Sequence, residues 1–515
     1  MAYASQQAHP QTQARSRIRS RRERRERTIM GRPARFMRPM ILVILVAGIL
    51  AAFGLMMIYS SSSIVAMSSA DYNNDPAFFL KSQARNLVLG VLIASVIARI
   101  EYHDLARRFT FWFWLLMMVL LVIIQTPIAG SDMYGATRWI SIGGFSLQPS
   151  EFVKPLLIVT SGMIFEQYFE ERSTNSKEFL IQLAIFVALP LFFVVIQPDK
   201  GTTLIIIMTI ICMLYLAGVR GKTIGVLIAI GFALFLLLSL RDSYSLARIQ
   251  TLLNPWGDRY RSSYQMIEGW YAFGSGGLFG TGIGSSHQKY AYLPMAYNDF
   301  ILAIVGEECG FVGCVGVLVG FVILLIQSFK IGNQAPDLLG RLIACGSASM
   351  LVIQLLVNIC GVLGMIPLSG KPVPFLSYGG SSIISTCMLV GLIISVSRSS
   401  MIARDEHDRA RETFHVTDGP GAGRGAEAQK GYRVSSASFM VLPGGASNQL
   451  HSRRASSSDV RNSAGQGYYS GGSGVSAPTE RRERPARLRL NSKADAGYNR
   501  RRRDARDPRR HTRRR

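Results

Sequence analysis

Long apolar stretches alternate with short polar breaks between residues 39 and 397. Repeated runs of about 18 or more mainly apolar residues are the length that a helix needs to cross the hydrocarbon core of a bilayer. The pattern predicts ten spans, at 39–60, 86–100, 109–128, 150–166, 178–197, 201–218, 222–240, 299–328, 340–366 and 376–397. We therefore expect an all-α polytopic membrane protein, and not the several soluble domains that 515 residues would otherwise suggest.

Positive charge is concentrated at the two ends of the chain. Residues 1–38 carry a net charge of +9 and residues 398–515 carry +14, out of +25 for the whole chain. Both tails are polar and lack an apolar face, which predicts disorder, although residues 398–414 have a helix-like mixed-charge pattern. Beside a membrane such tails favour anionic lipid or an acidic protein as partner, and nucleic acid is not expected.

Basic loop residues predict the orientation of the chain. An even number of spans places both basic tails on one side, together with the basic residues of four loops, which are Arg107, Arg108, Arg172, Lys177, Arg220, Lys222, Lys330 and Arg341. By the positive-inside rule this side is the cytoplasm, and the first apolar run reads as a retained helix without a cleavage site. The longest outer loop is then 241–298.

The sequence indicates no cofactor. The six cysteines lie in apolar segments without metal-ligand spacing and read as packing residues. His287 stands alone, and no nucleotide-binding or zinc motif appears. No metal site is predicted, although the sequence leaves a divalent cation open.

The most informative stretch is Tyr271–Gly313, which is rich in glycine and then enters an apolar run. That run carries Asp299, Glu307 and Glu308, and carboxylates at the mouth of a membrane segment are by default functional. Asn298 and Asp299 could instead cap a helix that begins near Asn298, and the local sequence weighs both interpretations evenly. One of Glu307 and Glu308 is expected to pair with a basic residue and to hold the helix.

A second polar cluster spans Gly135–Ile158. Arg138 and Trp139 suit the headgroup region, and Ser150 is expected to cap the following helix. Glu151 and Lys154 are three residues apart and could pair on one helix face. A function is favoured over a simple anchor, because an anchor needs no ion pair within the membrane.

Two further outer segments carry charge. Asp199 and Lys200 lie in a tight turn between two spans, where ordinary turn chemistry is the leading interpretation on local grounds. In Pro367–Ile384, prolines predict extended backbone, and Ser381 can satisfy freed backbone groups inside the span. Lys371 just outside is a natural partner for a phosphate.

Six motifs, in this order, resemble the SEDS family (shape, elongation, division and sporulation). They are GATRWISIGGFSLQPSEFVK, QPDKGTT, NPWGD, AFGSGGLFGTGIGSSHQKYAYLP, NDFILAIVGEE and GKPVPFLSYGGSS, within residues 39–397. The resemblance is strongest to the cell-division branch of the family and does not extend to the tails. One departure is that Met295 and Tyr297 stand where many members have glutamate and histidine.

The resemblance implies a ten-helix peptidoglycan glycosyltransferase that polymerises lipid II into glycan strands at the outer face of the plasma membrane during septal wall synthesis. Its implied partners are lipid II, the growing strand, a class B penicillin-binding protein and other division proteins. Asp299 matches the catalytic aspartate of the family. The candidate substrate-binding residues are Arg138, Trp139, Gln148, Glu151, Lys154, Asp199, Lys289, Lys371 and Ser377.

Three alternatives stay open at this point. An elongation polymerase of the same family has the same chemistry. A lipid II flippase would also explain intramembrane charges, but alternating access places its site near the midplane, whereas these polar clusters gather on one face. A scaffold without activity would need its tails and not Asp299.

Overall fold

The structure is a computed structural model that describes residues 28–413, except 30–31, 127–130, 134–135, 143–144, 198, 241–242, 262 and 291. The chain divides into two compact units, Met1–Ala422 and Gly423–Arg515. The second unit lies outside the described residues, and so do most of the two predicted basic tails.

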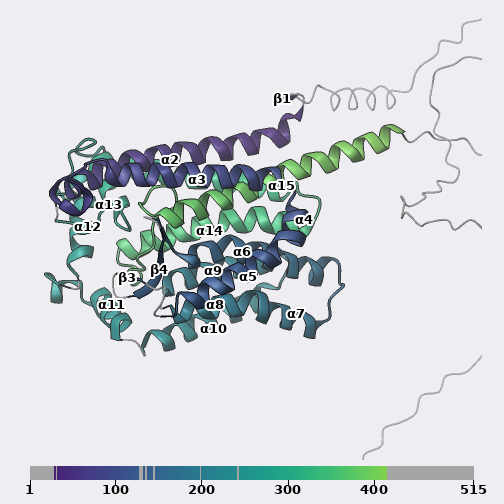
Figure 1. Ribbon diagram of the computed structural model, residues 1–515, viewed down its shortest axis with the longest axis horizontal. Coiled ribbons are helices and arrows are strands. Elements are labelled where there is room, and N and C mark those ends of the chain that lie inside the picture. Colours follow the sequence, from purple (N-terminus) through teal and green to yellow (C-terminus); the bar gives the residue numbers. More distant parts are fainter. Residues whose placement is uncertain are drawn as a thin grey trace, which may run out of the picture. The chain divides into compact units, whose positions relative to one another are not determined.

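Each of the ten predicted spans falls on helix (Figure 1). The corresponding elements are α2 (Ala34–Ser68), α3 (Phe78–Arg99), α5 (Thr110–Ile123), α6 (Pro149–Phe165), α7 with η4 and α8 (Ser176–Leu183, Ala184–Ala188, Leu189–Ile196), α9 (Lys200–Leu216), α10 (Gly221–Leu240), α13 (Ile301–Gly332), α14 (Leu338–Val362) and α15 (Gly380–Thr413). Within the described ranges, seven helical segments are long and apolar enough to cross a membrane. The three other spans are α6, α9 and α10. The all-α polytopic fold is confirmed.

Short elements occupy the connections. They are β1 (Thr28–Ile29), β2 (Arg32–Pro33), η1 (Ala70–Tyr72), α4 (Tyr102–Asp104), η2 (Leu105–Phe109), β3 (Ser131–Met133), β4 (Ala136–Ile142), β5 (Phe145–Leu147), η3 (Glu166–Glu170), α11 (Ser243–Leu253), η5 (Pro255–Asp258) and α12 (Tyr264–Gly276). Strands β3, β4 and β5 form an antiparallel sheet in that order. The long predicted loop 241–298 therefore contains two helices.

Helices α6, α14 and α15 form the interior of the bundle. Helix α6 contacts α5, α9, α14 and α15, and nearly all of its residues are buried. By contrast α3, which lies along α15 (Figure 1), exposes Val88, Leu92 and Val96. In a membrane protein such an exposed apolar face lies against lipid, where it needs no further partner.

Helix α13 is not continuous, although its sequence predicts one span. Gly310 has φ 69° and ψ −167°, which breaks the helix after its first turns. The freed carbonyl groups of Glu307 and Glu308 accept hydrogen bonds from the amides of Thr281 and Gly282 at 2.9 and 3.0 Å. The glycine-rich stretch after α12 is thereby fastened into the break, because irregular backbone at this depth is stable only when its polar groups are paired.

Two predicted helix ends differ from the structure. Helix α6 begins at Pro149 with Gln148 as its N-cap residue, so the predicted cap at Ser150 is wrong by two positions. Proline suits this first position because its missing N–H has no acceptor there in any case. Helix α15 runs on to Thr413, which confirms the helix-like pattern after residue 398 and places the predicted tail boundary inside a helix.

Candidate active site

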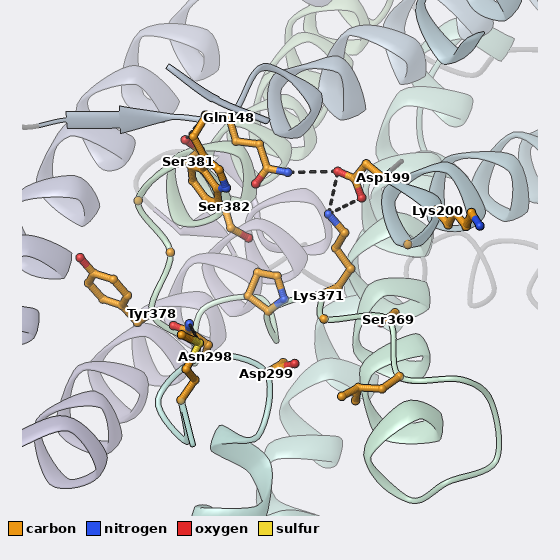
Figure 2. Close-up of a pocket in the computed structure, with 18 of the residues that line it drawn as sticks. Gln148, Asp199, Lys200, Asn298, Asp299, Ser369, Lys371, Tyr378, Ser381 and Ser382 are labelled. Atoms are coloured by element: carbon orange, nitrogen blue, oxygen red, sulfur yellow. Dashed lines mark hydrogen bonds and ion pairs between the residues drawn. The ribbon is translucent and has the colours of Figure 1, made fainter. Parts of the chain in front are cut away.

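A cavity of about 2190 Å³ lies where several helix ends meet. It is lined by α3, the segment before α6, the first residues of α9, α11, the segment before α13, residues 365–372 and the start of α15. Six of the predicted site residues line it, and Figure 2 shows most of them together: Trp139, Gln148, Asp199, Asp299, Lys371 and Ser381. The clusters that are far apart in the sequence therefore converge on one cavity.

Asp199 is the centre of a hydrogen-bond network in the cavity wall (Figure 2). Its carboxylate lies 2.7 Å from the Lys371 ammonium and accepts hydrogen bonds from Gln148 Nε2 at 3.0 Å and from Ser150 Oγ at 2.9 Å. It is also the N-cap of α9 and accepts from the Thr202 amide at 3.2 Å. This carboxylate is 1% exposed and fully paired, so the structure adds a buried ion pair to the predicted turn.

A second ion pair lies behind this wall. Lys154 Nζ is 2.6 Å from Glu151 Oε2, and both side chains are buried, which confirms the predicted pairing along α6. Gln354 accepts from Lys154 at 2.7 Å and donates to the Pro372 carbonyl at 2.7 Å, so it links this pair to the segment that carries Lys371. Neither Glu151 nor Lys154 is a lining residue of the cavity.

Asp299 lies in the cavity but outside this network. Helix α13 begins at Ile301 with Phe300 as its N-cap residue, and the cap makes no side-chain hydrogen bond. The expectation that Asn298 or Asp299 caps the helix is therefore wrong, because both precede the cap. The backbone carbonyl of Asp299 accepts a hydrogen bond from Asn358 Nδ2 at 2.7 Å, and the residue lines the cavity.

The electrostatic state of Asp299 also differs from that of Asp199. Burial raises the pKa of Asp299 to about 6, against smaller opposing effects of its own backbone amide and of Arg248. Among the described residues, no ion pair includes its carboxylate. A carboxyl group with a pKa near the working pH can exist in either protonation state, as a general base requires.

Lys289, Glu307 and Glu308 form a cluster away from the cavity lining. Lys289 Nζ lies 3.4 Å from Glu308 Oε1, and Ser60 Oγ donates to both oxygens of Glu308 at 2.6 and 2.8 Å. Glu307 accepts from Ser286 Oγ at 2.5 Å and from the His287 amide at 2.8 Å. The predicted pairing of a glutamate with a basic residue is confirmed, and the cluster holds the loop that leads to Asp299.

The other predicted residues have varied surroundings. Ser381 Oγ accepts from the Gln148 amide at 2.9 Å and donates to the Ser146 carbonyl. It therefore pairs with backbone groups, as predicted, but these belong to the segment before α6 and not to its own span. Ser377 Oγ accepts from the Val373 amide at 2.8 Å, and this residue is not part of the lining. Arg138 belongs to β4, but its side chain lies outside the described part of the structure.

Arg248 and Asn86 are among the lining residues that the sequence does not single out. Arg248 on α11 donates to the Leu368 carbonyl and is close enough to Asp299 to lower its pKa. Asn86 on α3 is 5% exposed and also lines the cavity. The signal for Asn86 was a polar residue at the start of a predicted span, whereas a single arginine in a long loop gave none.

Met295 and Tyr297, which stand where the SEDS motif often has glutamate and histidine, place an apolar and an aromatic side chain near the cavity. Tyr297 is buried and its ring lies 4.5 Å from that of Phe79 and 5.9 Å from that of Tyr378. Met295 lines the cavity with a φ of 51°. Within the described ranges, no group of three His, Cys, Asp or Glu side chains could hold a metal ion.

The fold and the cavity define a multi-pass membrane protein with a carboxylate at the entry to a membrane helix. The family model for "Cell cycle protein" FtsW/RodA/SpoVE matches residues 40–402, so the chain belongs to this family. Stage V sporulation protein E of Bacillus subtilis is 38% identical over 366 residues, which cover 70% of this chain and 98% of the relative. The "probable peptidoglycan glycosyltransferase FtsW" of Trichlorobacter lovleyi is 36% identical over 377 residues, covering 73% and 97%.

Solved structures agree with this assignment. One, titled "Structural coordination of polymerization and crosslinking by a peptidoglycan synthase complex", has a TM-score of 0.55 and 25% identity and covers 70% of this chain and 97% of its own. The crystal structure of the rod shape determining protein RodA of Thermus thermophilus has a TM-score of 0.50 and 24% identity, covering 69% and 96%. The likeness to RodA concerns the fold alone.

Proposed function

We propose that the protein is a peptidoglycan glycosyltransferase that polymerises lipid II into glycan strands. The observation that carries this proposal is Asp299, a carboxylate that lies in a large cavity without an ion-pair partner among the described residues and with a pKa of about 6. Relatives that share about a third of its sequence over most of its length are named for this activity.

The chemistry is a single displacement at an anomeric carbon. Asp299 takes the proton of the C4 hydroxyl of one lipid-linked disaccharide as the oxygen forms a bond to the anomeric carbon of the other. The bond from that carbon to the diphosphate breaks, undecaprenyl pyrophosphate leaves with the electron pair, and the α linkage becomes β. A base at the hydroxyl and a cation near the leaving group are the two groups that this step requires.

The cavity offers both groups. Arg248 lines the same cavity and lowers the pKa of Asp299, so it is the candidate cation for neutralising the leaving diphosphate. Lys200, next to the N-cap of α9, is a further cation in the lining. The volume of about 2190 Å³ exceeds the roughly 300–1,000 Å³ of a site for one small ligand. This size suits two lipid-linked substrates.

The cellular setting follows from the same assignment. The protein works in the plasma membrane with both termini in the cytoplasm and the cavity at the outer face, since the basic loops then lie inside. Its role is septal wall synthesis, together with a class B penicillin-binding protein and other division proteins. The structural relative whose title couples polymerisation with crosslinking supports such a partner. The basic tails bind anionic lipid or an acidic division protein.

The test is polymerisation of labelled lipid II by the purified protein with its class B penicillin-binding protein. Wild type should form glycan strands, whereas Asp299→Asn should bind the partner and form none. Asp75→Asn is the matched control, because Asp75 lines the same cavity but pairs with Lys81 at 2.7 Å. Equal polymerisation by wild type and Asp299→Asn would refute the proposed base. A folded wild-type complex that makes no strands but moves lipid II across a bilayer would establish a flippase instead.

A further inference from the structure

The long helix α15 begins inside the cavity. Its first hydrogen bond runs from the Ile383 amide to the Gly379 carbonyl at 3.0 Å, so the amides of Gly380, Ser381 and Ser382 have no acceptor within the helix. These three residues line the cavity. Amides at a helix start carry partial positive charge and form a site that favours anions.

A second observation at the same place points to a ligand. Asn86 is 5% exposed and lines the same cavity, and its Oδ1 atom has no hydrogen-bond partner in the described part of the chain. Its Nδ2 atom is so close to Gly380 that a Cβ atom there would lie 2.6 Å from it. An unpaired buried polar atom costs about 1–3 kcal/mol, and a ligand with a hydroxyl or N–H group removes this cost.

Two buried lysines near the cavity are already paired with carboxylates and do not themselves form an anion site. The ammonium groups of Lys371 and Lys154 are paired with Asp199 and Glu151, so neither carries uncompensated charge. Even so, the lining holds five lysine and arginine side chains against three aspartates. A polymerase binds two lipid-linked substrates, each with a diphosphate, and Arg248 accounts for only one of them.

We propose that the N-terminus of α15, with Ser382 and Asn86, binds the diphosphate of the second lipid-linked substrate. The amides of Gly380, Ser381 and Ser382 donate to its phosphate oxygens, and Asn86 Oδ1 accepts from a hydroxyl or acetamido N–H of the first sugar. Ser381 and Ser382 lie beside Gln148, across Lys371 from Ser369 (Figure 2), so this position is separate from the one near Arg248. The inference rests on the proposed function for its substrate class.

Ser382→Asp is the sharpest variant. A carboxylate in the first turn stabilises a helix, so a purely structural role of Ser382 predicts an unchanged or higher unfolding temperature and unchanged ligand binding. The same carboxylate repels a diphosphate. With farnesyl pyrophosphate as probe, native mass spectrometry should show two bound molecules for wild type and one for Ser382→Asp. Asn86→Asp should give the same loss.

Controls separate this site from the rest of the protein. Ser385 lies one turn further along α15 and donates to the Glu151 carbonyl at 2.7 Å, so Ser385→Ala should leave two molecules bound. Farnesol, which lacks the diphosphate, should bind equally to wild type and to both variants. Phosphatidylglycerol should not displace the second molecule.

The proposal would be overturned if both acidic variants still bound two molecules of farnesyl pyrophosphate. It would also be overturned if the variants lost farnesol binding as well as farnesyl pyrophosphate binding. Displacement by phosphatidylglycerol would overturn the substrate assignment and identify a headgroup site. The binding assay does not depend on turnover. A chain that binds two molecules and makes no glycan would therefore overturn the proposed function and leave this site standing.

Discussion

Two aspartates line the same cavity with opposite surroundings. Asp199 accepts hydrogen bonds from Gln148, Ser150 and Thr202 and pairs with Lys371. Asp299 takes part in no ion pair among the described residues and has a pKa raised to about 6. A carboxylate that is fully paired gains little by taking up a proton. The comparison therefore supports the two proposed roles, in which Asp199 holds the cavity wall and Asp299 transfers the proton.

The cavity wall around Asp199 depends on a close approach between Lys371 and the start of α9. Lys371 lies across the start of α9, where a Cβ atom on Gly201 would lie 2.8 Å from its Cγ atom. Only glycine permits this approach, which brings the ammonium group to Asp199. The wall therefore depends on buried charges that must be kept together, since breaking one partner of a buried pair is costly.

The largest effect should come from breaking that pair. Lys371→Met leaves the Asp199 carboxylate buried and uncompensated, which should lower the free energy of unfolding by about 3–5 kcal/mol. Thermal unfolding in detergent, followed by tryptophan fluorescence, measures this loss. Adding Asp199→Asn removes the buried charge and should restore part of the stability. A double variant less stable than Lys371→Met would contradict the assignment of Asp199 to the wall.

A smaller effect should follow from disturbing the glycine-rich stretch that is fastened into α13. Gly280 has φ 82°, and a Cβ atom there would lie 2.2 Å from the Glu308 carbonyl oxygen. Gly280→Ala should therefore destabilise the protein by more than the roughly 1–2 kcal/mol of the left-handed conformation alone. Gly284→Ala is the control, because Gly284 has φ 83° and no atom within 4 Å. Equal unfolding temperatures for the two variants would argue against the close contact.

The pH dependence of polymerisation sharpens the comparison further. Because the pKa of Asp299 is raised to about 6, its carboxylate takes up a proton below that pH and can no longer act as a base. The rate should fall by about tenfold for each pH unit below 6. The same raised pKa affects stability in the opposite direction. Because the folded protein disfavours the ionised form of Asp299, the free energy of unfolding falls as the pH rises from 3.8 through 6.

The measurement is a pH–rate profile from pH 4.5 to 8, with Asp75→Asn as the control variant. The pKa of Asp75 is lowered by its hydrogen bond to Lys81, so its substitution should leave the acid limb unchanged. A flat profile, or a limb that moves in Asp75→Asn, would show that Asp299 is not the titrating base.

The smallest effect concerns Met295, which has a φ of 51° and lies two residues before Tyr297. Asparagine tolerates this conformation better than methionine, so Met295→Asn should raise stability by up to about 1 kcal/mol. Differential scanning calorimetry in nanodiscs would detect the rise in unfolding temperature. A lower temperature would mean that the apolar contacts of Met295 outweigh its backbone strain.

The lengths of the apolar runs in the sequence predict the helices of the fold correctly. Each of the ten spans is a helix, because the need to pair backbone groups inside lipid leaves few alternatives to helix. The break at Gly310 was not predicted, since a glycine within an apolar run is common and its φ is decided by the loop that docks there. The starts of α6 and α13 were each misplaced by about two residues, as cap chemistry alone did not distinguish neighbouring polar positions.

The site was predicted in part. Asp299 lines the cavity, and its catalytic role stays a prediction. The local pair Glu151–Lys154 is confirmed, because three-residue spacing fixes contact on a helix. The Asp199–Lys371 pair joins residues 172 positions apart, and no local pattern reveals such a partner. For the same reason Arg248 was missed, and Lys289 was placed with the substrate although it pairs with Glu308.

The most direct test of the account measures stability and chemistry together for Asp299→Asn in complex with the class B penicillin-binding protein. The single-turnover rate of lipid II polymerisation should fall by about 10²–10⁴-fold, which is the usual contribution of a general base, while the unfolding temperature stays at or above that of wild type. A wild-type rate, or a loss of rate that only follows a loss of stability, would contradict the assignment of Asp299 as the base.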